Sequence, residues 1–392
     1  MSGDDRAAAP AAWAETAALA ARTLAMEPTR GIPSWIANVM DMGYQERVAE
    51  YAPGSYREDP DGVHLAFLRK TGACFVDQYL ATNPLTMEVH GYGADTVRTA
   101  ATGAEEIVLD GRVIASEEDV IAHLEEVVFP GIEAAIAAEC TGDEATVVAG
   151  ILAQERAAQA MLGPSLLKVP YGEGFNHFPY LRYTQYGYVN YLTAFVMYPE
   201  VMARDFALQA DLAALRNRAG ARAIVEGGLP RVIRLDHDMA DSRGTLVSVR
   251  MLEELWFPHF ARAIQPYLDA GVRLIWHCDG NLMEMVPRLI ACGVGGFQGF
   301  QYEDGMDYER ICRMTTRDGG PLMIWGGVSV TRTLPFGTPE DVRREIAWLV
   351  EHAPPVGFVL GASSSVTPGA PWANLDAFVE GLAYYREHGR GG

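Results

Sequence analysis

Residues 277–279, His-Cys-Asp, place an imidazole and a carboxylate directly after an apolar, β-branched run at 272–276. Successive side chains of an extended chain point to opposite sides, so we expect His277 and Asp279 to share a cavity while Cys278 faces elsewhere. Imidazole and carboxylate together suit zinc, which makes His277 and Asp279 candidate metal ligands. The alternative is a pair of hydrogen-bonded strand-end residues beside a cysteine packed in the core.

A second run of the same kind, Asp236-His237-Asp238, follows the apolar stretch at 232–235. Carboxyl groups beside an imidazole can transfer protons, and burial would raise a carboxyl pKa toward that work. We therefore interpret His237 and Asp238 as candidate catalytic residues and Asp236 as a candidate substrate contact. Helix-capping aspartates give the same pattern and remain an open alternative.

The segment 171–191 is rich in aromatic side chains that follow no single helical face. Such a segment could wall a flat or hydrophobic ligand, with tyrosine hydroxyls as polar contacts. A lid on a rim or a subunit interface would give the same composition. The candidate substrate contacts from this segment are Tyr171, Glu173, Phe175, His177 and Tyr180.

Two further loops supply polar candidates, Gln301 after an apolar run at 296–300 and Ser364 within the glycine- and serine-rich residues 361–365. The loops at 326–327 and 361–365 also resemble places where barrels bind phosphate through backbone amides. Neither has a Lys or Arg beside its glycines, so ordinary tight turns are favoured.

These residues need a scaffold in which strand ends converge. Short apolar runs at 272–276, 296–300, 321–325 and 357–360 alternate with helical patterns at 281–291, 308–314, after Thr338 and at 373–385. Thr338 and Asp341 form a predicted capping box ahead of a helix with Pro339 at its first position. Further strand candidates lie at 167–169, 223–225 and 232–235.

Alternating strands and helices predict parallel strands with crossover helices. No GxGxxG motif follows a strand and no Walker A sequence occurs, so we expect an α/β fold of the (β/α)8 TIM-barrel type rather than an open nucleotide-binding sheet. In such a barrel the catalytic groups lie at the carboxyl ends of the strands, where the residues above are placed.

We expect residues 1–30 to form a tail and an N-terminal helical extension, and residues 31–392 to form a single barrel domain. Turn residues at Gly91, Gly93, Gly103 and Asp110-Gly111 predict a β-hairpin insertion at about 86–114, near the first barrel unit.

The composition narrows the class of protein. The chain of 392 residues has 49% hydrophobic residues and a formal net charge of −20, which excludes general disorder and makes nucleic-acid binding unfavourable. No apolar run is long enough to span a membrane, and the acidic start is unlike an export signal. Five unclustered cysteines fit a reducing compartment, so we expect a cytoplasmic protein with no membrane or nucleic-acid partner.

At these residues the chain resembles the uroporphyrinogen decarboxylase superfamily over roughly residues 31–388, which implies a (β/α)8 barrel. The motifs that carry the resemblance are Gly31-Ile-Pro-Ser-Trp35, Thr96-Val-Arg-Thr99, Asp236-His-Asp-Met239, His277-Cys-Asp-Gly-Asn281, Gly305-Met-Asp307, Phe336-Gly-Thr-Pro-Glu-Asp-Val342 and Pro371-Trp-Ala-Asn374.

Two branches of that superfamily differ at these motifs. True uroporphyrinogen decarboxylases carry arginines soon after the early Pro-x-Trp element, whereas here no arginine follows Trp35 until Arg47. Corrinoid-linked methyltransferases hold zinc with a His-x-Cys pair and a distant Cys. His277 matches that His, while Asp279 and Ser364 stand about where the two cysteines belong, so the resemblance implies an oxygen-richer site that need not hold zinc.

The resemblance to the methyltransferase branch implies methyl transfer between a small methoxy- or methylamine-type compound and a corrinoid carried by a partner protein. His277 and Asp279 would polarise the leaving heteroatom, directly or through zinc, and Asp238 or His237 would supply its proton. The alternatives are a metal-independent decarboxylase of a small acid and a non-catalytic ligand-binding barrel. A homodimer through the aromatic-rich rim also stays open.

Overall fold

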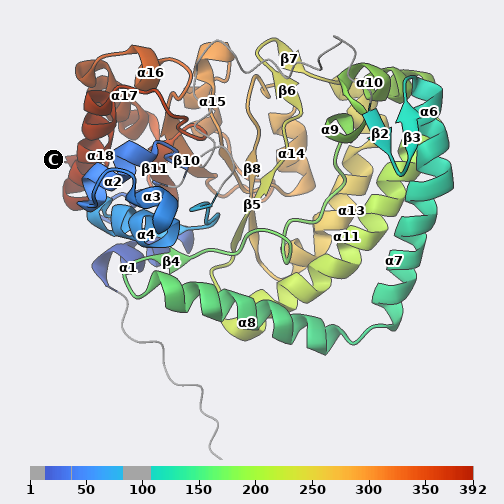
Figure 1. The fold of residues 1–392 in the computed structure, drawn as a ribbon, viewed down its shortest axis with the longest axis horizontal. Helices are drawn as coiled ribbons and strands as arrows, with labels where there is room; N and C mark the ends of the chain where they lie inside the picture. Colours follow the sequence, from blue (N-terminus) through green and yellow to red (C-terminus); the bar gives the residue numbers. More distant parts are fainter. Residues whose placement is uncertain (1–13, 37, 83–106, 392) are drawn as a thin grey trace, which may run out of the picture.

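The computed structural model describes residues 14–36, 38–82 and 107–391. Its largest sheet has five parallel strands in the order β5, β8, β9, β10, β11. The order of the strands across the sheet is the same as their order along the chain. Helices lie between consecutive strands and cover the outside of the sheet (Figure 1). The strands are β5 (Val232–Asp236), β8 (Arg273–His277), β9 (Gly296–Gln298), β10 (Met323–Val328) and β11 (Phe358–Ala362).

The N-terminal part of the chain continues this sheet into a (β/α)8 TIM barrel. The backbone N–H of Trp35 donates to the carbonyl of Leu360 in β11 at 2.9 Å, and Cys74 N–H donates to the Ser34 carbonyl at 2.9 Å. Strand β1 (Phe75–Val76) then pairs in parallel with β4 (Leu167–Lys168). In the described part of the chain no backbone hydrogen bond joins β4 to β5, which leaves a seam between them.

The barrel interior is filled by large apolar side chains. Trp325 of β10 lies with its ring centroid 5.8 Å from that of Trp35 and 5.0 Å from that of Phe75. The N-terminal extension is helix α1 (Glu15–Leu24), whose Ala17, Ala20 and Leu24 join this interior cluster. Helix α1 therefore closes the end of the barrel at which the strands begin.

A helix follows each of β8, β9, β10 and β11 in the expected order, and two helices after β5 and a short one after β10 add to the four that the pattern predicts. The capping box is confirmed, because Thr338 and Asp341 satisfy each other's backbone N–H groups at the start of α17 (Pro339–His352). The helix expected from residue 281 begins only at Val286, after a turn. The helices are α12 (Val249–Leu255), α13 (Phe257–Asp269), α14 (Val286–Cys292), α15 (Tyr308–Cys312), α16 (Thr333–Phe336), α17 (Pro339–His352) and α18 (Trp372–His388).

One expected strand is wrong. Residues 223–225 belong to helix α11 (Pro199–Gly227), where Ala223 and Ile224 are buried and Val225 is 46% exposed. Ala219, Gly220, Ala223 and Ile224 continue one buried helical face, so the short apolar run is the last turn of a long amphipathic helix.

Part of the predicted hairpin insertion is confirmed. β2 (Ile107–Leu109) and β3 (Arg112–Ile114) pair antiparallel across Asp110-Gly111, both of which have positive φ angles as a two-residue turn requires. Gly91, Gly93, Gly103 and the motif at 96–99 lie outside the described residues.

The remaining helices surround the barrel. In Figure 1 α8 runs along the lower edge and α7 along the right edge, and both pack against α11. Within the described residues no helix combines the length and apolarity needed to cross a membrane. These helices are α2 (Met42–Ala49), α3 (Ser55–Glu58), α4 (Pro60–Thr71), α6 (Glu117–His123), α7 (Phe129–Thr141), α8 (Glu144–Leu162), α9 (Tyr183–Tyr186) and α10 (Tyr188–Met197).

Candidate active site

The two candidate motifs end adjacent strands. β5 and β8 pair in parallel with Asp236 directly opposite His277, so both side chains point into the barrel at its carboxyl end. His277 Nε2 lies 3.9 Å from Asp236 Oδ1 and 3.8 Å from Asp279 Oδ1. The imidazole of His277 therefore stands between two carboxylates from different strands.

Asp238 completes the cluster. One ligand atom each from Asp238, His277 and Asp279 lies within 4.8 Å of the other two. The backbone N–H of Asp279 donates to Asp238 Oδ1 at 2.8 Å, which ties the loop after β8 to the loop after β5. Cys278 faces away from the cluster, is buried, and accepts the backbone N–H of Met239 at 3.2 Å.

A buried arginine supports the cluster from below. Arg234, two residues before Asp236 on the same side of β5, donates from Nε to Asp77 at 2.7 Å and from Nη1 to Asp236 at 2.8 Å. Tyr171 donates to the same Asp236 oxygen at 3.3 Å. Sequence reasoning missed Arg234 and Asp77, although a charged residue inside the otherwise apolar run 232–235 was a usable signal.

The surroundings push the pKa values of two carboxyl groups apart. Burial opposes ionisation of Asp236, but the charges of His277 and Arg234 outweigh it and lower the pKa of that carboxyl. Burial raises the pKa of Asp279, against the charge of His277 and with the repulsion of Asp238. Two carboxyls that face one imidazole with oppositely shifted pKa values are typical of a reaction centre.

Two further candidate residues hold the loops of the cluster in place. Ser364, in the loop after β11, donates to Asp279 Oδ2 at 3.1 Å. Gln301, in the loop after β9, accepts the backbone N–H of Gly280 at 2.6 Å. Gly299 lets the His277 ring sit close to the backbone, because a Cβ there would lie 2.6 Å from His277 Nδ1.

The structure does not bring His237 into the cluster. Its Nε2 accepts the backbone N–H of Leu181 at 2.9 Å, and its ring stacks on Tyr183 with centroids 5.6 Å apart. Burial lowers its pKa to about 4. The His237 imidazole is therefore neutral, and its Nε2 is already engaged as a hydrogen-bond acceptor. We conclude that His237 packs the loop after β5 against the aromatic segment 171–191.

Of the candidate substrate contacts in the aromatic segment 171–191, Tyr171 lies on the cluster and the others lie outside it. Tyr171 contacts Asp236 and lies on the cluster, whereas Phe175 is buried outside it and accepts a hydrogen bond from Tyr267 through its carbonyl. His177, whose pKa burial lowers to about 4, accepts from Asn217 through its carbonyl. Glu173 is exposed, and Tyr180 is 43% exposed beside Arg182.

The cluster has the chemistry to hold a cation. Asp279 Oδ1, which lies 3.8 Å from His277 Nε2, is a buried polar atom without a hydrogen-bond partner among the described residues. Three carboxylates surround one imidazole, while Arg234 is already bound to Asp77 and Asp236. This donor set fits a divalent ion such as zinc held by His277 and Asp279.

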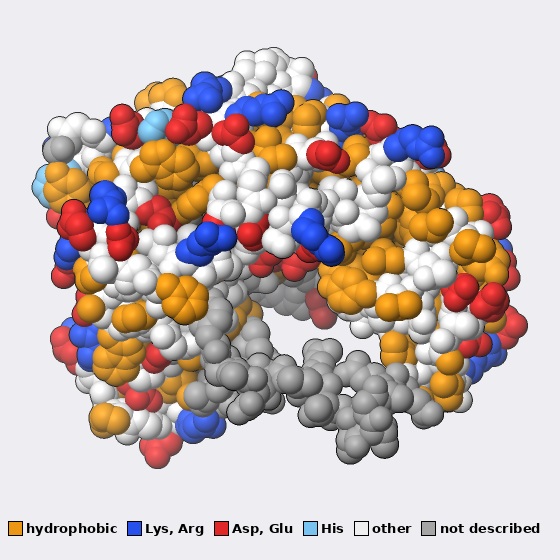
Figure 2. Space-filling model, turned by 90° about the horizontal axis from the view of Figure 1, so that it is seen from above, with side chains coloured by type: hydrophobic (Ala, Val, Ile, Leu, Met, Phe, Trp, Pro, Cys, Tyr) orange, Lys and Arg blue, Asp and Glu red, His pale blue; other side chains and the backbone are white. Residues whose placement is uncertain are grey.

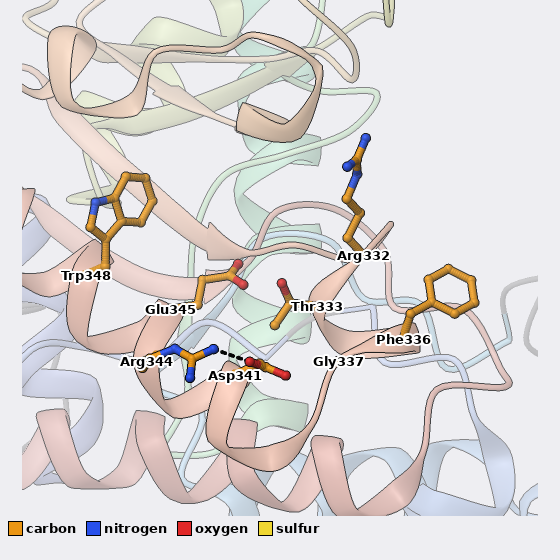
Figure 3. A pocket seen from close by; sticks show the side chains of 8 residues that line it. All are labelled: Arg332, Thr333, Phe336, Gly337, Asp341, Arg344, Glu345 and Trp348. Atoms are coloured by element: carbon orange, nitrogen blue, oxygen red, sulfur yellow. Dashed lines mark hydrogen bonds and ion pairs between the residues drawn. The ribbon is translucent and has the colours of Figure 1, made fainter.

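A surface hollow lies apart from the cluster, between α16 and α17. Figure 3 shows Glu345 and Thr333 between Trp348 on one side and Arg332 and Phe336 on the other. Burial raises the pKa of Glu345 to about 7, although its Oε1 accepts the Ser329 backbone N–H at 2.6 Å. Exposed apolar side chains also gather on α10, namely Tyr188, Val189, Val196 and Met197, on the right-hand side of the view from above in Figure 2.

The strand order and the position of the site define a TIM barrel with its candidate reaction centre at the carboxyl ends of the strands. The family model of uroporphyrinogen decarboxylase (URO-D) matches residues 187–385, just over half of the chain. The chain therefore belongs to the URO-D family. The matched region of the chain contains β5, β8 and the residues of the cluster.

Comparison of structures identifies the same fold. A methyltransferase from Methanosarcina mazei is similar over 94% of this chain and 98% of its own, with a TM-score of 0.53 and 15% identity. A B12-independent methionine synthase from Shewanella sp. W3-18-1, in complex with selenomethionine, has a TM-score of 0.34 and 14% identity over 47% of this chain and 56% of its own, too distant to support an argument. No curated protein matches the sequence.

Proposed function

We propose that this protein transfers a methyl group between a small methylated compound and a corrinoid carried by a partner protein. The observation that carries the proposal is the meeting of Asp238, His277 and Asp279 at the mouth of a URO-D-family barrel. The similarity in fold to a methyltransferase supports the same class of reaction.

His277 and Asp279 would hold a zinc ion through Nε2 and a carboxylate oxygen. When bound, zinc supplies a Lewis acid that stabilises negative charge on the leaving heteroatom. Ser364 fixes one oxygen of Asp279 and leaves the other, Oδ1, directed toward His277. A ligand set with more oxygen and less sulfur suits an oxygen or nitrogen leaving atom better than a thiol.

Asp238 is the proton donor in this proposal. It is the exposed member of the cluster, and its Oδ1 is held by the Asp279 backbone N–H. In its protonated form, the carboxyl group of Asp238 would donate its proton to the heteroatom as the bond to the methyl carbon breaks, and solvent, to which Asp238 is exposed, would return a proton to it. The corrinoid supplies the nucleophile that accepts the methyl group.

Tyr171 and Asp236 would form the inner wall of the substrate site. Arg234 holds Asp236 ionised and lies with its guanidinium carbon 4.8 Å from the Tyr171 ring centroid. Because both carboxylate contacts of Arg234 are already made within the protein, it is poorly placed to bind a substrate carboxylate. This arrangement favours a methoxy or methylamine donor over a carboxylic acid.

The experiment is a methyl-transfer assay with free cob(I)alamin as the acceptor and methanol, methoxybenzene and methylamine as donors. We expect methylcobalamin to form with at least one donor and formation to fall about 100-fold or more in Asp279→Asn. The matched control is Asp269→Asn, an exposed aspartate at the end of α13. Release of CO2 from a small acid without methylcobalamin formation would establish the decarboxylase alternative, and equal rates in both variants would contradict the proposed centre.

A further inference from the structure

A cavity lies on the barrel at the end opposite to the cluster. Its volume is about 850 Å³, within the range of roughly 300–1,000 Å³ that small-molecule sites occupy. It opens between the end of α1, helix α8, the start of β4 and the loop that enters β5. This is the lower end of the seam between β4 and β5, on the side where Figure 1 shows α1 and α8.

The cavity is separate from the candidate active site. Arg273 begins β8 and lines the cavity, whereas His277 ends the same strand at the cluster. Four residues of extended chain place the two about 13 Å apart. A ligand in the cavity would therefore approach the barrel from its other face.

The charge of the lining is opposite to that of the chain. Among the described residues that line the cavity, four are cationic, Arg156, Lys168, Arg231 and Arg273, and one is acidic, Glu155. Glu155 is paired with Lys168 at 3.3 Å. Positive charge is thus concentrated here in a protein whose formal net charge is −20.

The three arginines have no carboxylate partner within the described residues. Arg231 donates to the Ala270 carbonyl at 3.3 Å, and Arg273 donates to the Gly295 carbonyl at 2.9 Å. Burial lowers the pKa of Arg273, and no neighbouring anion offsets that cost. Guanidinium groups that have no carboxylate partner within the protein bind phosphate and carboxylate oxygens of a ligand strongly.

The rest of the lining is apolar. Leu24 and Met26 at the end of α1, Leu167 of β4 and Leu229 form a hydrophobic wall beside the cations. Water leaves such a wall when an apolar group covers it, so the cavity suits a ligand with both an anionic head and an apolar body.

We infer that this cavity is a second binding site, for an organic anion that joins a phosphate or carboxylate group to an apolar chain. The guanidinium groups of Arg156, Arg231 and Arg273 bind the anionic oxygens. The wall of Leu24, Met26, Leu167 and Leu229 covers the apolar part. The inference does not depend on the proposed methyl transfer.

The test is isothermal titration calorimetry of the full-length protein with octyl phosphate, with octanoate as the carboxylate arm. Inorganic phosphate and octyl glucoside, each carrying only one of the two features, are the control ligands. We expect octyl phosphate or octanoate to bind at least about tenfold more tightly than either control and more weakly as salt increases. Whichever head group binds more tightly identifies the source of the anion.

The matched variants are Arg156→Gln with Arg231→Gln, both at exposed positions, and Arg250→Gln, an exposed arginine on α12. The double variant should weaken binding about tenfold or more, while Arg250→Gln leaves it unchanged. Absence of binding by both organic anions at millimolar concentration would overturn the inference, as would equal binding by octyl glucoside or an unchanged affinity in the double variant. Thermal unfolding of both variants checks that they are folded.

Discussion

Ser364 Oγ donates to Asp279 Oδ2 at 3.1 Å, although 85 residues separate the two along the chain. The contact joins the loop after β11 to the loop after β8 across the mouth of the barrel. These are the two positions at which the methyltransferase branch, by resemblance, would carry cysteines. At these two positions the chain has a carboxylate and a hydroxyl group that bind each other.

Asp279→Asn should lower methyl transfer about 100-fold or more, because an amide neither carries the charge nor binds zinc as a carboxylate does. Ser364→Ala removes one hydrogen bond, worth about 1 kcal/mol, and should lower the rate only about fivefold. Steady-state kinetics of methylcobalamin formation measures both. Equal losses in the two variants would contradict the assignment of Asp279 as the direct contact and Ser364 as its support.

Gly299→Ala should weaken zinc binding about tenfold, because the new Cβ would lie 2.6 Å from His277 Nδ1 and displace the imidazole. The matched control is Gly319→Ala, which has a similar positive φ of 83° but nothing within 4 Å of the added Cβ. Both variants carry backbone strain of about 1–3 kcal/mol. Competition titration with a chelator should separate them, and indistinguishable zinc affinities would count against His277 as a ligand.

Arg234→Gln should reduce the free energy of unfolding by about 3–5 kcal/mol, since it leaves Asp77 buried without its cation. Arg182→Gln, which breaks the buried pair with Asp205 away from the cluster, should cost a similar amount. Urea denaturation measures both losses. Only Arg234→Gln should also shift the pH profile of activity upward on its acid side, because Arg234 helps to keep Asp236 ionised; the same profile in both variants would show that Arg234 is structural alone.

Glu345→Gln should change how stability depends on pH. The pKa of Glu345 is raised to about 7 in the folded protein by burial, above its value of about 4.3 in the unfolded chain. The folded state therefore binds a proton that the unfolded state has lost, and this stabilisation is present below about pH 4.3 and disappears as pH rises to about 7. As pH rises from about 4.3 to about 7, the unfolding free energy of the wild type should therefore fall relative to that of Glu345→Gln. Above about pH 7 the difference between the two proteins should no longer change with pH. A difference that stays constant from pH 4 to 8 would contradict the raised pKa.

Much of the C-terminal half of the barrel could be predicted from the sequence. The runs that contain β5, β8, β10 and β11 are apolar, short and bounded by turn residues, and Thr338 and Asp341 mark a helix start. The first strands were missed, because the segment around Ser34 and the two residues of β1 are too short to show a period. Residues 223–225 were misassigned because a short apolar run has the same pattern in a buried strand and in the last turn of a helix.

The sequence predicted the orientation of some residues of the candidate site but not of others. Alternation along an extended chain placed His277 and Asp279 on one side and Cys278 on the other, as the structure has them. Alternation did not reveal that the His237 ring would be held by the backbone of Leu181, a contact that depends on how a distant loop returns to the barrel. The catalytic, substrate-binding and metal-binding roles of these residues stay predictions.

The most direct test of the account is elemental analysis of the purified protein and of two histidine variants. We predict about one zinc per chain in the wild type, loss of that zinc in His277→Ala, and retention in His237→Ala, whose ring packs outside the cluster. A wild-type protein that stays active without metal, or a His277→Ala variant that keeps its zinc, would contradict the proposed centre.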